Sequence, residues 1–177
     1  VARRICQEHG QADAIVSSFS FAHIDNMIDV MNGVQALLKD DGAFIFEVYY
    51  LGIILDEMQY DMIYHEHMSY YSLTSLIKFF ESFGMEIYDL KRIPLRTGTI
   101  RFYARKTGEK RQPMSPAVTE LLESERRRKF DSPQTYLDYA GRVQQTRRDL
   151  ISLLDTLKRE GKTIVGYGAT GRAATIM

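Results

Sequence analysis

The densest group of titratable side chains in the sequence is the segment Y-H-E-H at residues 64–67, which Tyr70 and Tyr71 follow closely. The chain has only four histidines, and two of them lie in this segment. A buried polar group costs free energy unless it finds a hydrogen-bonding partner, so such a run is not typical of a core. Imidazole changes its charge near neutral pH and also binds metal ions. The segment therefore indicates a site that moves protons or holds a metal.

Three interpretations of this segment stay open from the residues alone. General acid–base catalysis fits His67, Glu66 and Tyr64, because all three exchange protons. Metal binding fits His65 and His67 with His23 as a third ligand, although a single His-x-His pair is a weak zinc pattern. The structural interpretation is that both imidazoles only bind loop backbone. We favour acid–base chemistry and expect no metal at this site.

A second pattern is the glycine spacing Gly166-x-Gly168-x-x-Gly171, which follows a strand expected at residues 162–167. Glycines let backbone amides approach a phosphate closely at a helix N-terminus, so these three are candidates for nucleotide binding. A nicotinamide or flavin site would also need an acidic residue roughly 20 positions further on. The alternative is a close strand-to-helix turn that binds no ligand.

Two strands and a helix are predicted to position the acid–base residues. Residues 13–21 and 43–50 are apolar and rich in β-branched or aromatic side chains, which predicts two parallel strands, the first of them buried. Helical spacing of apolar residues over 26–39 predicts the helix between them. The run Asp40-Asp41-Gly42 predicts the turn that ends this helix.

The ends of the two strands carry further polar side chains. His23 follows the first strand, and residues 47–50 end the second. Open parallel sheets place ligands at the carboxyl ends of their strands. We therefore expect His23, Tyr49 and the Y-H-E-H segment to converge on one crevice.

The following residues complete an α/β pattern. Residues 73–83 carry a helical apolar stripe that Gly84 ends, and residues 85–93 and 99–106 read as two strands of an antiparallel hairpin. The order strand, helix, strand, helices, strand, strand predicts an α/β fold. It corresponds to the second half of a Rossmann-like, doubly wound sheet whose last strand turns back antiparallel.

A boundary is expected within residues 107–116, which are polar and contain two prolines. Ser115-Pro116 and Ser132-Pro133 each place a capping serine before a first-turn proline, so two helices are predicted to follow. The second runs to about residue 160 and carries an apolar stripe that needs a partner surface. The strand expected at residues 162–167 then begins another α/β unit.

Composition narrows the class of protein. The 177 residues are 45% apolar and 26% charged, which is typical of a globular protein. Basic and acidic side chains number 23 each, and this balance argues against nucleic acid as a partner. The single cysteine, Cys6, excludes internal disulfides and cysteine clusters. No apolar run is long enough to span a bilayer and no signal peptide is visible, so we predict a cytoplasmic protein without a membrane partner.

The balanced charge hides a segregation along the chain. Residues 1–90 carry a formal net charge of −10, and the residues after them carry +10. One interpretation is that the two parts face one another or are interspersed in space. The other is that the basic part meets a phosphorylated ligand.

Several segments, taken together, resemble a known family. The family is the nucleotide-sugar C-methyltransferases, S-adenosylmethionine-dependent enzymes that methylate deoxysugar precursors, and Y-H-E-H combined with a downstream G-Y-G-A is specific to it. The matching segments follow in order over nearly the whole chain: A-D-A-I-V-S-S-F-S-F-A-H-I (12–24), G-V-Q-A-L-L-K-D-D-G-A-F-I-F-E-V (33–48), Y-H-E-H-M-S-Y-Y-S-L (64–73), G-T-I-R (98–101) and G-K-T-I-V-G-Y-G-A (161–169).

This resemblance implies a domain organisation. Residues 1–108 would form the C-terminal half of a methyltransferase domain, residues 109–161 a helical linker region, and residues 162–177 the start of a C-terminal Rossmann-like domain. Such proteins also have an N-terminal zinc-binding module and a glycine motif that holds the cofactor. Neither has a counterpart in this sequence, so zinc is expected only in that missing module.

The resemblance also implies a substrate and residue roles. The substrate would be a nucleotide-linked keto-deoxysugar, methylated on a carbon next to its ketone. His67 is the best candidate for the base, with Glu66 and Tyr64 orienting it or stabilising the enolate, and the choice of base between His67 and Tyr64 stays open. The substrate-binding candidates are His23, His65, Arg96 and Arg101, the two arginines for a sugar diphosphate.

Two other functions stay open. One is a nicotinamide-dependent oxidoreductase that uses the glycine turn at residues 166–171, which an acidic residue at the end of the next strand would favour. The other is a non-catalytic protein that binds a nucleotide sugar.

Overall fold

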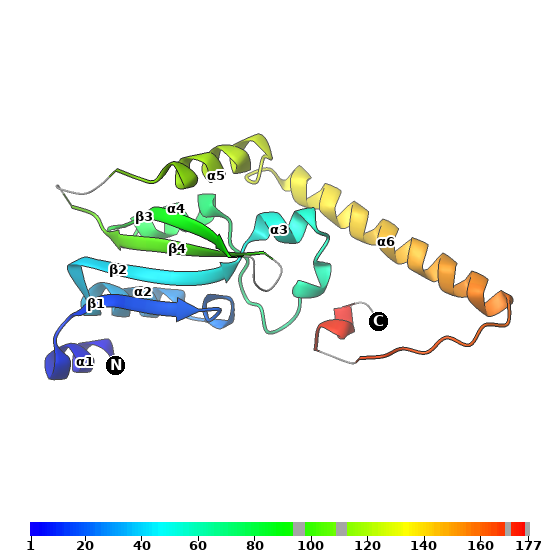
Figure 1. Cartoon of the computed structure of the whole chain (residues 1–177), viewed down its shortest axis with the longest axis horizontal. Coiled ribbons are helices and arrows are strands. Elements are labelled where there is room, and N and C mark those ends of the chain that lie inside the picture. Colours follow the sequence, from blue (N-terminus) through cyan, green and yellow to red (C-terminus); the bar gives the residue numbers. More distant parts are fainter. Residues whose placement is uncertain (94–97, 109–112, 169–170, 176–177) are drawn as a thin grey trace.

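The computed structural model describes residues 1–93, 98–108, 113–168 and 171–175. A four-stranded sheet carries helices that share its core, and the long helix α6 extends away from it (Figure 1). The elements are α1 (Ala2–His9), β1 (Ala12–Ser18), the 3-10 helix η1 (Phe21–His23), α2 (Met27–Leu37), β2 (Leu38–Tyr49), α3 (Leu51–Asp56), η2 (Tyr60–Met62), α4 (Leu73–Glu81), β3 (Met85–Ile93), β4 (Thr99–Lys106), α5 (Pro116–Arg127), α6 (Pro133–Arg159) and η3 (Gly171–Thr175).

The sheet has the strand order β1-β2-β4-β3. β1 pairs with β2 in parallel, and β4 runs antiparallel to both of its neighbours, with Glu47 opposite Arg101 and Ile93 opposite Thr99. The predicted hairpin strands coincide with β3 and β4, and the last strand is antiparallel as expected. The fold class predicted for the sheet is therefore confirmed.

Two predicted boundaries in the first half of the chain are wrong. β1 ends at Ser18 and not at residue 21, because Phe19 has a positive φ of 55° and the chain then turns into η1. The turn expected at Asp40-Asp41-Gly42 lies inside β2, which begins at Leu38. The parallel register shifts between Ala12 and Ala14, so the turn-forming residues are accommodated as an irregularity of the strand.

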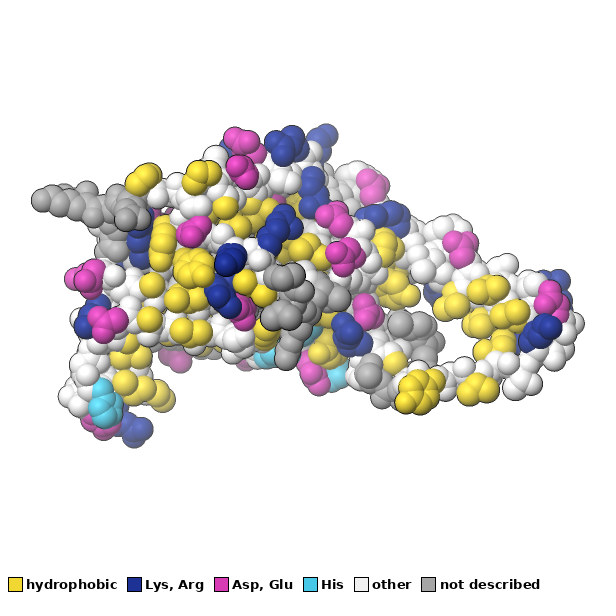
Figure 2. All heavy atoms as spheres, in the orientation of Figure 1, with side chains coloured by type: hydrophobic (Ala, Val, Ile, Leu, Met, Phe, Trp, Pro, Cys, Tyr) yellow, Lys and Arg dark blue, Asp and Glu magenta, His cyan; other side chains and the backbone are white. Residues whose placement is uncertain are grey.

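The expectation that β1 is buried is also wrong. Val16 in the middle of this strand is 71% exposed, and β1 is an edge strand to which no other strand pairs on its outer side within the described residues. Burial of a parallel strand requires cover on both faces, and that cover is not a property of the strand's own residues. Figure 2 shows hydrophobic side chains gathered over the strands on the face in view.

The core is organised around a group of phenylalanines. Phe46 is fully buried in β2 and stacks on Phe21, Phe80 and Phe102 at ring-centroid distances of 4.9, 5.1 and 5.4 Å. These rings come from η1, α4 and β4, so Phe46 packs two helical elements and a neighbouring strand together.

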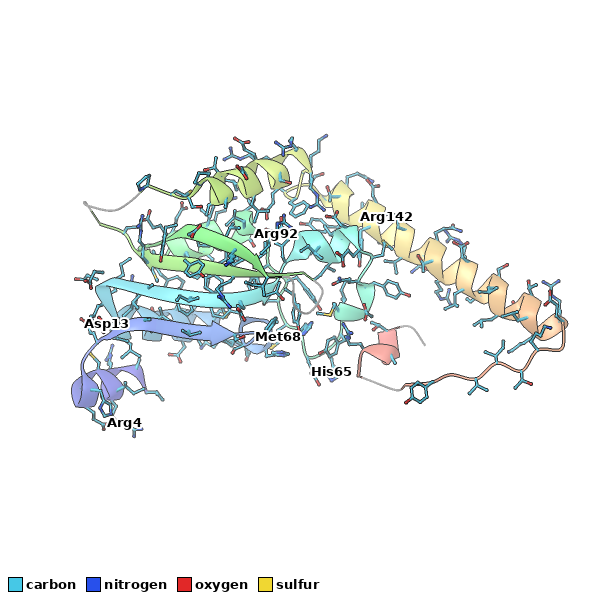
Figure 3. All side chains as sticks on the ribbon, viewed as in Figure 1. Arg4, Asp13, His65, Met68, Arg92 and Arg142 are labelled. Carbon is cyan, nitrogen blue, oxygen red and sulfur yellow. The ribbon has the colours of Figure 1, made fainter. Side chains whose placement is uncertain are left out.

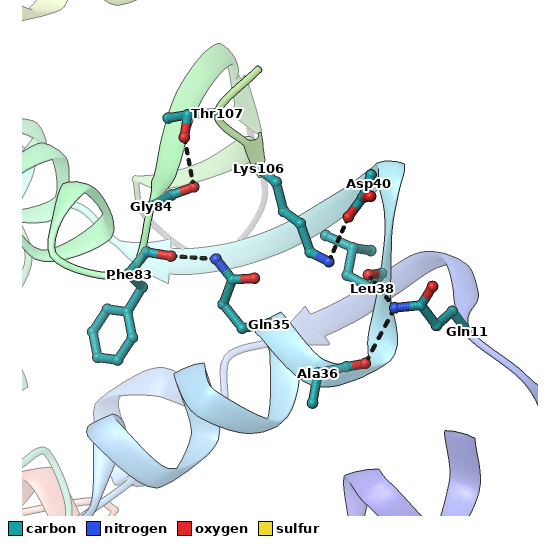
Figure 4. Close-up of polar contacts among 9 residues, drawn as sticks. All are labelled: Gln11, Gln35, Ala36, Leu38, Asp40, Phe83, Gly84, Lys106 and Thr107. Carbon is teal, nitrogen blue, oxygen red and sulfur yellow. Dashed lines mark hydrogen bonds and ion pairs between the residues drawn. The ribbon is translucent and has the colours of Figure 1, made fainter. Parts of the chain in front are cut away.

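Polar contacts connect the elements at the end of the sheet where β2 begins and β4 ends (Figure 4). The amide of Gln11 donates to the carbonyls of Ala36 and Leu38 at 3.4 and 3.3 Å. Lys106 at the end of β4 binds Asp40 at 3.0 Å. Lys106 thus holds one turn residue of β2, whereas Gln11, which precedes β1, binds the backbone where α2 passes into β2.

The charged halves of the chain face one another. Acidic residues before position 90 pair with basic residues after it, which confirms the first of the two interpretations of the charge segregation. The ion pairs are Glu47–Arg101 at 2.6 Å, Asp40–Lys106 at 3.0 Å, Glu86–Arg105 at 2.7 Å, Asp56–Arg128 at 2.5 Å and Asp61–Arg172 at 3.4 Å.

The two predicted helices after the sheet are confirmed. Ser115 and Ser132 accept hydrogen bonds from the amides of Ala117 and Gln134, and a proline begins each helix. The apolar stripe of α6 remains exposed, with Leu153 at 55%, so the described residues do not supply the partner surface that was expected. Among the helices in the described part of the chain, none combines the length and the apolarity needed to cross a bilayer.

The strand expected at residues 162–167 is not formed. The described residues 162–168 are extended but belong to no sheet. A strand is stable only when a neighbour satisfies its backbone groups, and no strand among the described residues pairs with this segment. The chain then returns to the sheet side, where η3 lies against η2.

Candidate active site

A group of imidazole and phenol rings lies at the carboxyl ends of β1 and β2. The His67 ring is at its centre, with ring-centroid distances of 5.1 Å to His23, 5.4 Å to Tyr49, 4.5 Å to Tyr64 and 6.2 Å to Tyr70. These residues come from η1, the end of β2 and the loop between η2 and α4. The structure thus brings His23 and Tyr49 together with His67 and Tyr64 of the Y-H-E-H segment, as predicted for these four residues.

Backbone contacts fix the loop against η1. The amide of Met68 donates to the carbonyl of Ala22 at 2.7 Å, and the Tyr71 hydroxyl donates to the carbonyl of Phe21 at 2.8 Å. Figure 3 shows Met68 and His65 on this loop, beyond the end of the sheet. The loop is thus held on the carboxyl-end side of the strands without regular secondary structure of its own.

Hydrogen bonds define the tautomers of both central histidines. Nδ1 of His67 lies 2.8 Å from the carbonyl oxygen of Met62, and Nδ1 of His23 lies 2.8 Å from the carbonyl oxygen of Glu66. A carbonyl oxygen only accepts, so each Nδ1 donates a proton, and in the neutral ring Nε2 keeps the lone pair. Backbone binding and proton transfer are thus compatible, because Nδ1 binds the backbone carbonyl and Nε2 can accept a proton.

The surroundings of His67 favour its neutral form. The side chain is buried, at 8% exposure, and this burial lowers the pKa of the imidazole below its ordinary value of 6.5. Repulsion from His23 when that ring is protonated, and from Arg172, lowers the pKa further, whereas the Met62 carbonyl and Glu66 oppose the shift. A neutral imidazole with a free Nε2 is suited to accept a proton near pH 7.

Tyr64 is held in its protonated form. Its hydroxyl donates to the carboxylate of Glu66 at 3.4 Å, and burial followed by the charge of Glu66 raises the pKa of the phenol. The hydroxyl of Tyr70 donates to the carbonyl of Met62 at 3.3 Å, and burial raises its pKa as well. These phenols are therefore hydrogen-bond donors at neutral pH.

The metal interpretation has no ligand set in the part of the chain that the structure describes, where no three His, Cys, Asp or Glu side chains are grouped for an ion. His65 is exposed, and its ring contacts Tyr64 edge-on at 5.8 Å. His65 thus stands apart from the pair formed by His23 and His67.

An ion pair that the sequence did not single out adjoins the rings. Arg101 on β4 donates to Oε1 of Glu47 through Nε and Nη2 at 2.8 and 2.6 Å, and Ser18 donates to Oε2 at 2.7 Å. The Ser18 bond, and after it Arg101, lowers the pKa of the Glu47 carboxyl. Glu47 precedes Tyr49 by two residues, so both lie on one face of β2. The sequence feature that could have pointed to this ion pair is Glu47 itself, a charged residue within an otherwise apolar strand.

The remaining candidates are placed as follows. Arg96 lies outside the described residues. Gly166 and Gly168 lie in the extended segment and Gly171 begins η3, and a Cβ added at any of them would meet no atom within 4 Å. Gly168 has a φ of +97°, which favours glycine. The neighbouring Arg172 reaches the ring site, at 3.4 Å from Asp61 and 2.7 Å from the sulfur of Met62.

The lowered pKa of His67 predicts a pH dependence of stability. Below about pH 6.5 the unfolded chain binds a proton at this imidazole that the folded protein resists, so the free energy of unfolding should fall as pH decreases through the folded-state pKa. Urea unfolding of the wild type and of His67→Gln across this range measures the effect. The wild type should lose more stability than the variant, and equal losses would contradict the buried, neutral imidazole.

Two family models match the chain. A model described as the C-methyltransferase C-terminal domain matches residues 94–177, and a methyltransferase domain model matches residues 3–90. The C-methyltransferase NovU of Streptomyces niveus is 36% identical over 177 residues, which is all of this chain and 42% of that protein. The chain therefore spans less than half the length of this relative.

Solved structures give looser similarities. A methyltransferase in complex with the Trm112 methyltransferase activator of Haloferax volcanii has a TM-score of 0.46 and 14% identity, covering 58% of this chain and 57% of the other. M1.HpyAVI has a TM-score of 0.38 and 13% identity, covering 65% and 59%.

Proposed function

Because the chain belongs to the C-methyltransferase family, we propose that the protein methylates carbon with S-adenosylmethionine. The proposed acceptor is the carbon next to the ketone of a nucleotide-linked keto-deoxysugar. The observation that carries this proposal is the buried imidazole of His67, whose Nδ1 is occupied by the Met62 carbonyl and whose Nε2 is left to accept a proton. Carbon methylation needs a base of this kind, because the acceptor carbon must first lose a proton.

The proposed chemistry begins at the ketone. Nε2 of His67 accepts a proton from the adjacent carbon, the C–H electron pair moves into the new carbon–carbon double bond, and the carbonyl pair moves to oxygen. Phenol donors beside His67 stabilise the negative oxygen, and Tyr64, the nearest of them, does so by turning its single hydroxyl proton from Glu66 to that oxygen. The enolate carbon then forms a bond to the methyl group, and the methyl–sulfur bond breaks with its electron pair left on sulfur. S-adenosylmethionine supplies that electrophilic methyl group when bound.

The arrangement of the described residues supports a cofactor at this end of the sheet. Parallel strands bind ligands at their carboxyl ends, and Ser18, Glu47 and Tyr49 mark those ends of β1 and β2. Aromatic faces such as that of Tyr49 attract a sulfonium cation. We propose that these residues hold the acceptor side of the cofactor site.

The tyrosine pKa supports His67 over Tyr64 as the base. Burial and the charge of Glu66 raise the pKa of Tyr64, so its hydroxyl keeps its proton, whereas burial lowers the pKa of His67. The proposed roles are therefore proton acceptor for His67, oxyanion donor for Tyr64 and orientation of Tyr64 for Glu66. His23 and His65 are proposed to contact the sugar.

A sugar diphosphate is the proposed ligand of Arg101, together with Arg96. Since Arg101 already binds Glu47, a phosphate must share the guanidinium with this carboxylate. Replacing Arg101 with Met should weaken nucleotide-sugar binding about tenfold by loss of a charge-assisted contact. Calorimetric titration measures this, with Arg105→Met on the same strand, paired with Glu86, as the matched control. Unchanged affinity in R101M would rule out the contact.

The domain boundaries near residues 108 and 161 and a cytoplasmic location remain part of the proposal. The glycines at 166, 168 and 171 are proposed to bind the nucleotide, and the neighbouring Arg172 beside η2 supports a ligand shared with the ring site. If these glycines instead bind a dinucleotide, the protein is an oxidoreductase.

Cofactor binding separates these functions. Calorimetric titration of the intact protein with S-adenosylhomocysteine and, separately, with NAD is the test. Binding of S-adenosylhomocysteine without NAD is the expected result. Binding of NAD alone would contradict the methyltransferase proposal and move the reacting centre to the glycine turn.

A further inference from the structure

The segment that carries Y-H-E-H is a closed loop with a narrow neck. We call residues 51–71 the site loop: it leaves the sheet after Tyr50 and returns before α4. Its two ends lie side by side, because the amide of Leu51 donates to the carbonyl of Tyr71 at 2.9 Å and Tyr50 forms a parallel bridge with Tyr71. The position of His67 within the loop therefore depends on how firmly this neck is held.

A single carboxylate from α5 binds both sides of the neck. Glu125 is 1% exposed. Its Oε1 accepts from the Tyr50 hydroxyl at 2.9 Å and from the amide of Leu73 at 2.7 Å, on opposite sides of the site loop. Its Oε2 accepts from the amide and the hydroxyl of Thr74 at 2.7 and 2.6 Å. Four donors saturate a carboxylate, and the negative charge is favourable at the N-terminus of α4.

Neighbouring arginines hold the first part of the same loop. Arg128 donates to the carbonyl of Gly52 at 3.2 Å and to Asp56 at 2.5 Å. Arg142 on α6, labelled in Figure 3, donates to the carbonyl of Leu55 at 2.9 Å. Helices α5 and α6 thus fix α3 as well as the neck, and Glu125 is the buried centre of this contact.

We infer that Glu125 is a positioning residue, which acts through the neck of the site loop to hold His67 in register with the substrate. This inference rests on the proposed function. Within the part of the chain that the structure describes, Glu125 binds Tyr50, Leu73 and Thr74 but no ring of the group around His67, so its effect is transmitted by the loop backbone. A displacement of a reacting group by about 1 Å can cost about 10²-fold in rate.

The test is Glu125→Gln in the intact protein. The glutamine amide is a donor, so two of the four donors lose their acceptor and meet another donor. Backbone amides of residues 62–71 should exchange with deuterium at least about tenfold faster. The kcat for exchange of the proton next to the substrate ketone should fall about tenfold or more, with a smaller change in KM. Glu123→Gln removes the same charge from an exposed site on α5 and should change neither quantity.

Loop exchange and kcat equal to wild type in folded E125Q would overturn the inference, even if the variant melts at a lower temperature. Should E125Q fail to fold, Tyr50→Phe removes one donor and keeps the bonds to α4, and it should speed exchange of the same amides by a smaller factor. Unchanged exchange in Y50F would then overturn the inference. A wild-type protein that exchanges no substrate proton would refute the proposed function instead, because the effect of E125Q on loop amides is measured without substrate.

Discussion

Replacing His67 with Gln in the intact protein is expected to lower the rate of proton exchange next to the substrate ketone by about 10²- to 10⁴-fold, the usual contribution of a general base. Glutamine keeps a polar amide of similar size beside the Met62 carbonyl, to which Nδ1 of His67 donates, but it has no basic lone pair. The loss would therefore report the missing base and not a displaced loop. Nuclear magnetic resonance of the substrate in deuterated water measures the exchange directly.

His9→Gln is the matched control for this variant. His9 is an exposed residue at the end of α1, at the opposite end of the sheet from the ring site, and its recorded contact is with Glu8 at 3.8 Å. Exchange at the wild-type rate is expected in H9Q. A wild-type rate in folded H67Q would exclude His67 as the base and leave Tyr64 as the candidate.

Replacing Phe46 with Ala is expected to reduce the free energy of unfolding by about 3–5 kcal/mol. Phe46 is fully buried and stacks on rings from η1, α4 and β4, so its loss leaves a cavity where these elements meet. Urea unfolding of the intact protein measures the change.

An exposed apolar residue provides the comparison for F46A. Ile28→Ala on α2 removes an aliphatic side chain that is largely exposed, and its effect should stay within about 0.5 kcal/mol. Similar losses for the two variants would contradict the central place of Phe46 in the core.

The elements that the sequence predicted correctly are those whose signals are local. Residues 85–93 and 99–106, predicted as the strands of a hairpin, form β3 and β4 with those bounds, and the serine–proline pairs predicted the starts of α5 and α6. The nearness of His23 and Tyr49 to one another, on either side of the His67 ring, was predictable because they follow and end two parallel strands whose carboxyl ends lie at the same end of the sheet.

The features that the sequence did not reveal depend on distant partners. Residues 162–167 have the composition of a strand, but a strand also requires a neighbour, and composition carries no information about one. The exposure of Val16 likewise depends on what covers β1. Glu125 lies 52 residues from Leu73 in sequence, so nothing local marks it as a partner of the site loop.

The most direct test of the proposed function is to incubate the intact protein with S-adenosylmethionine bearing a labelled methyl group and a nucleotide-linked keto-deoxysugar, and to locate the label by nuclear magnetic resonance. The account predicts a methyl group on the carbon next to the ketone, formed by the wild type and not by His67→Gln. A labelled methyl on oxygen or nitrogen, or carbon methylation that persists in folded H67Q, would contradict enolisation by His67.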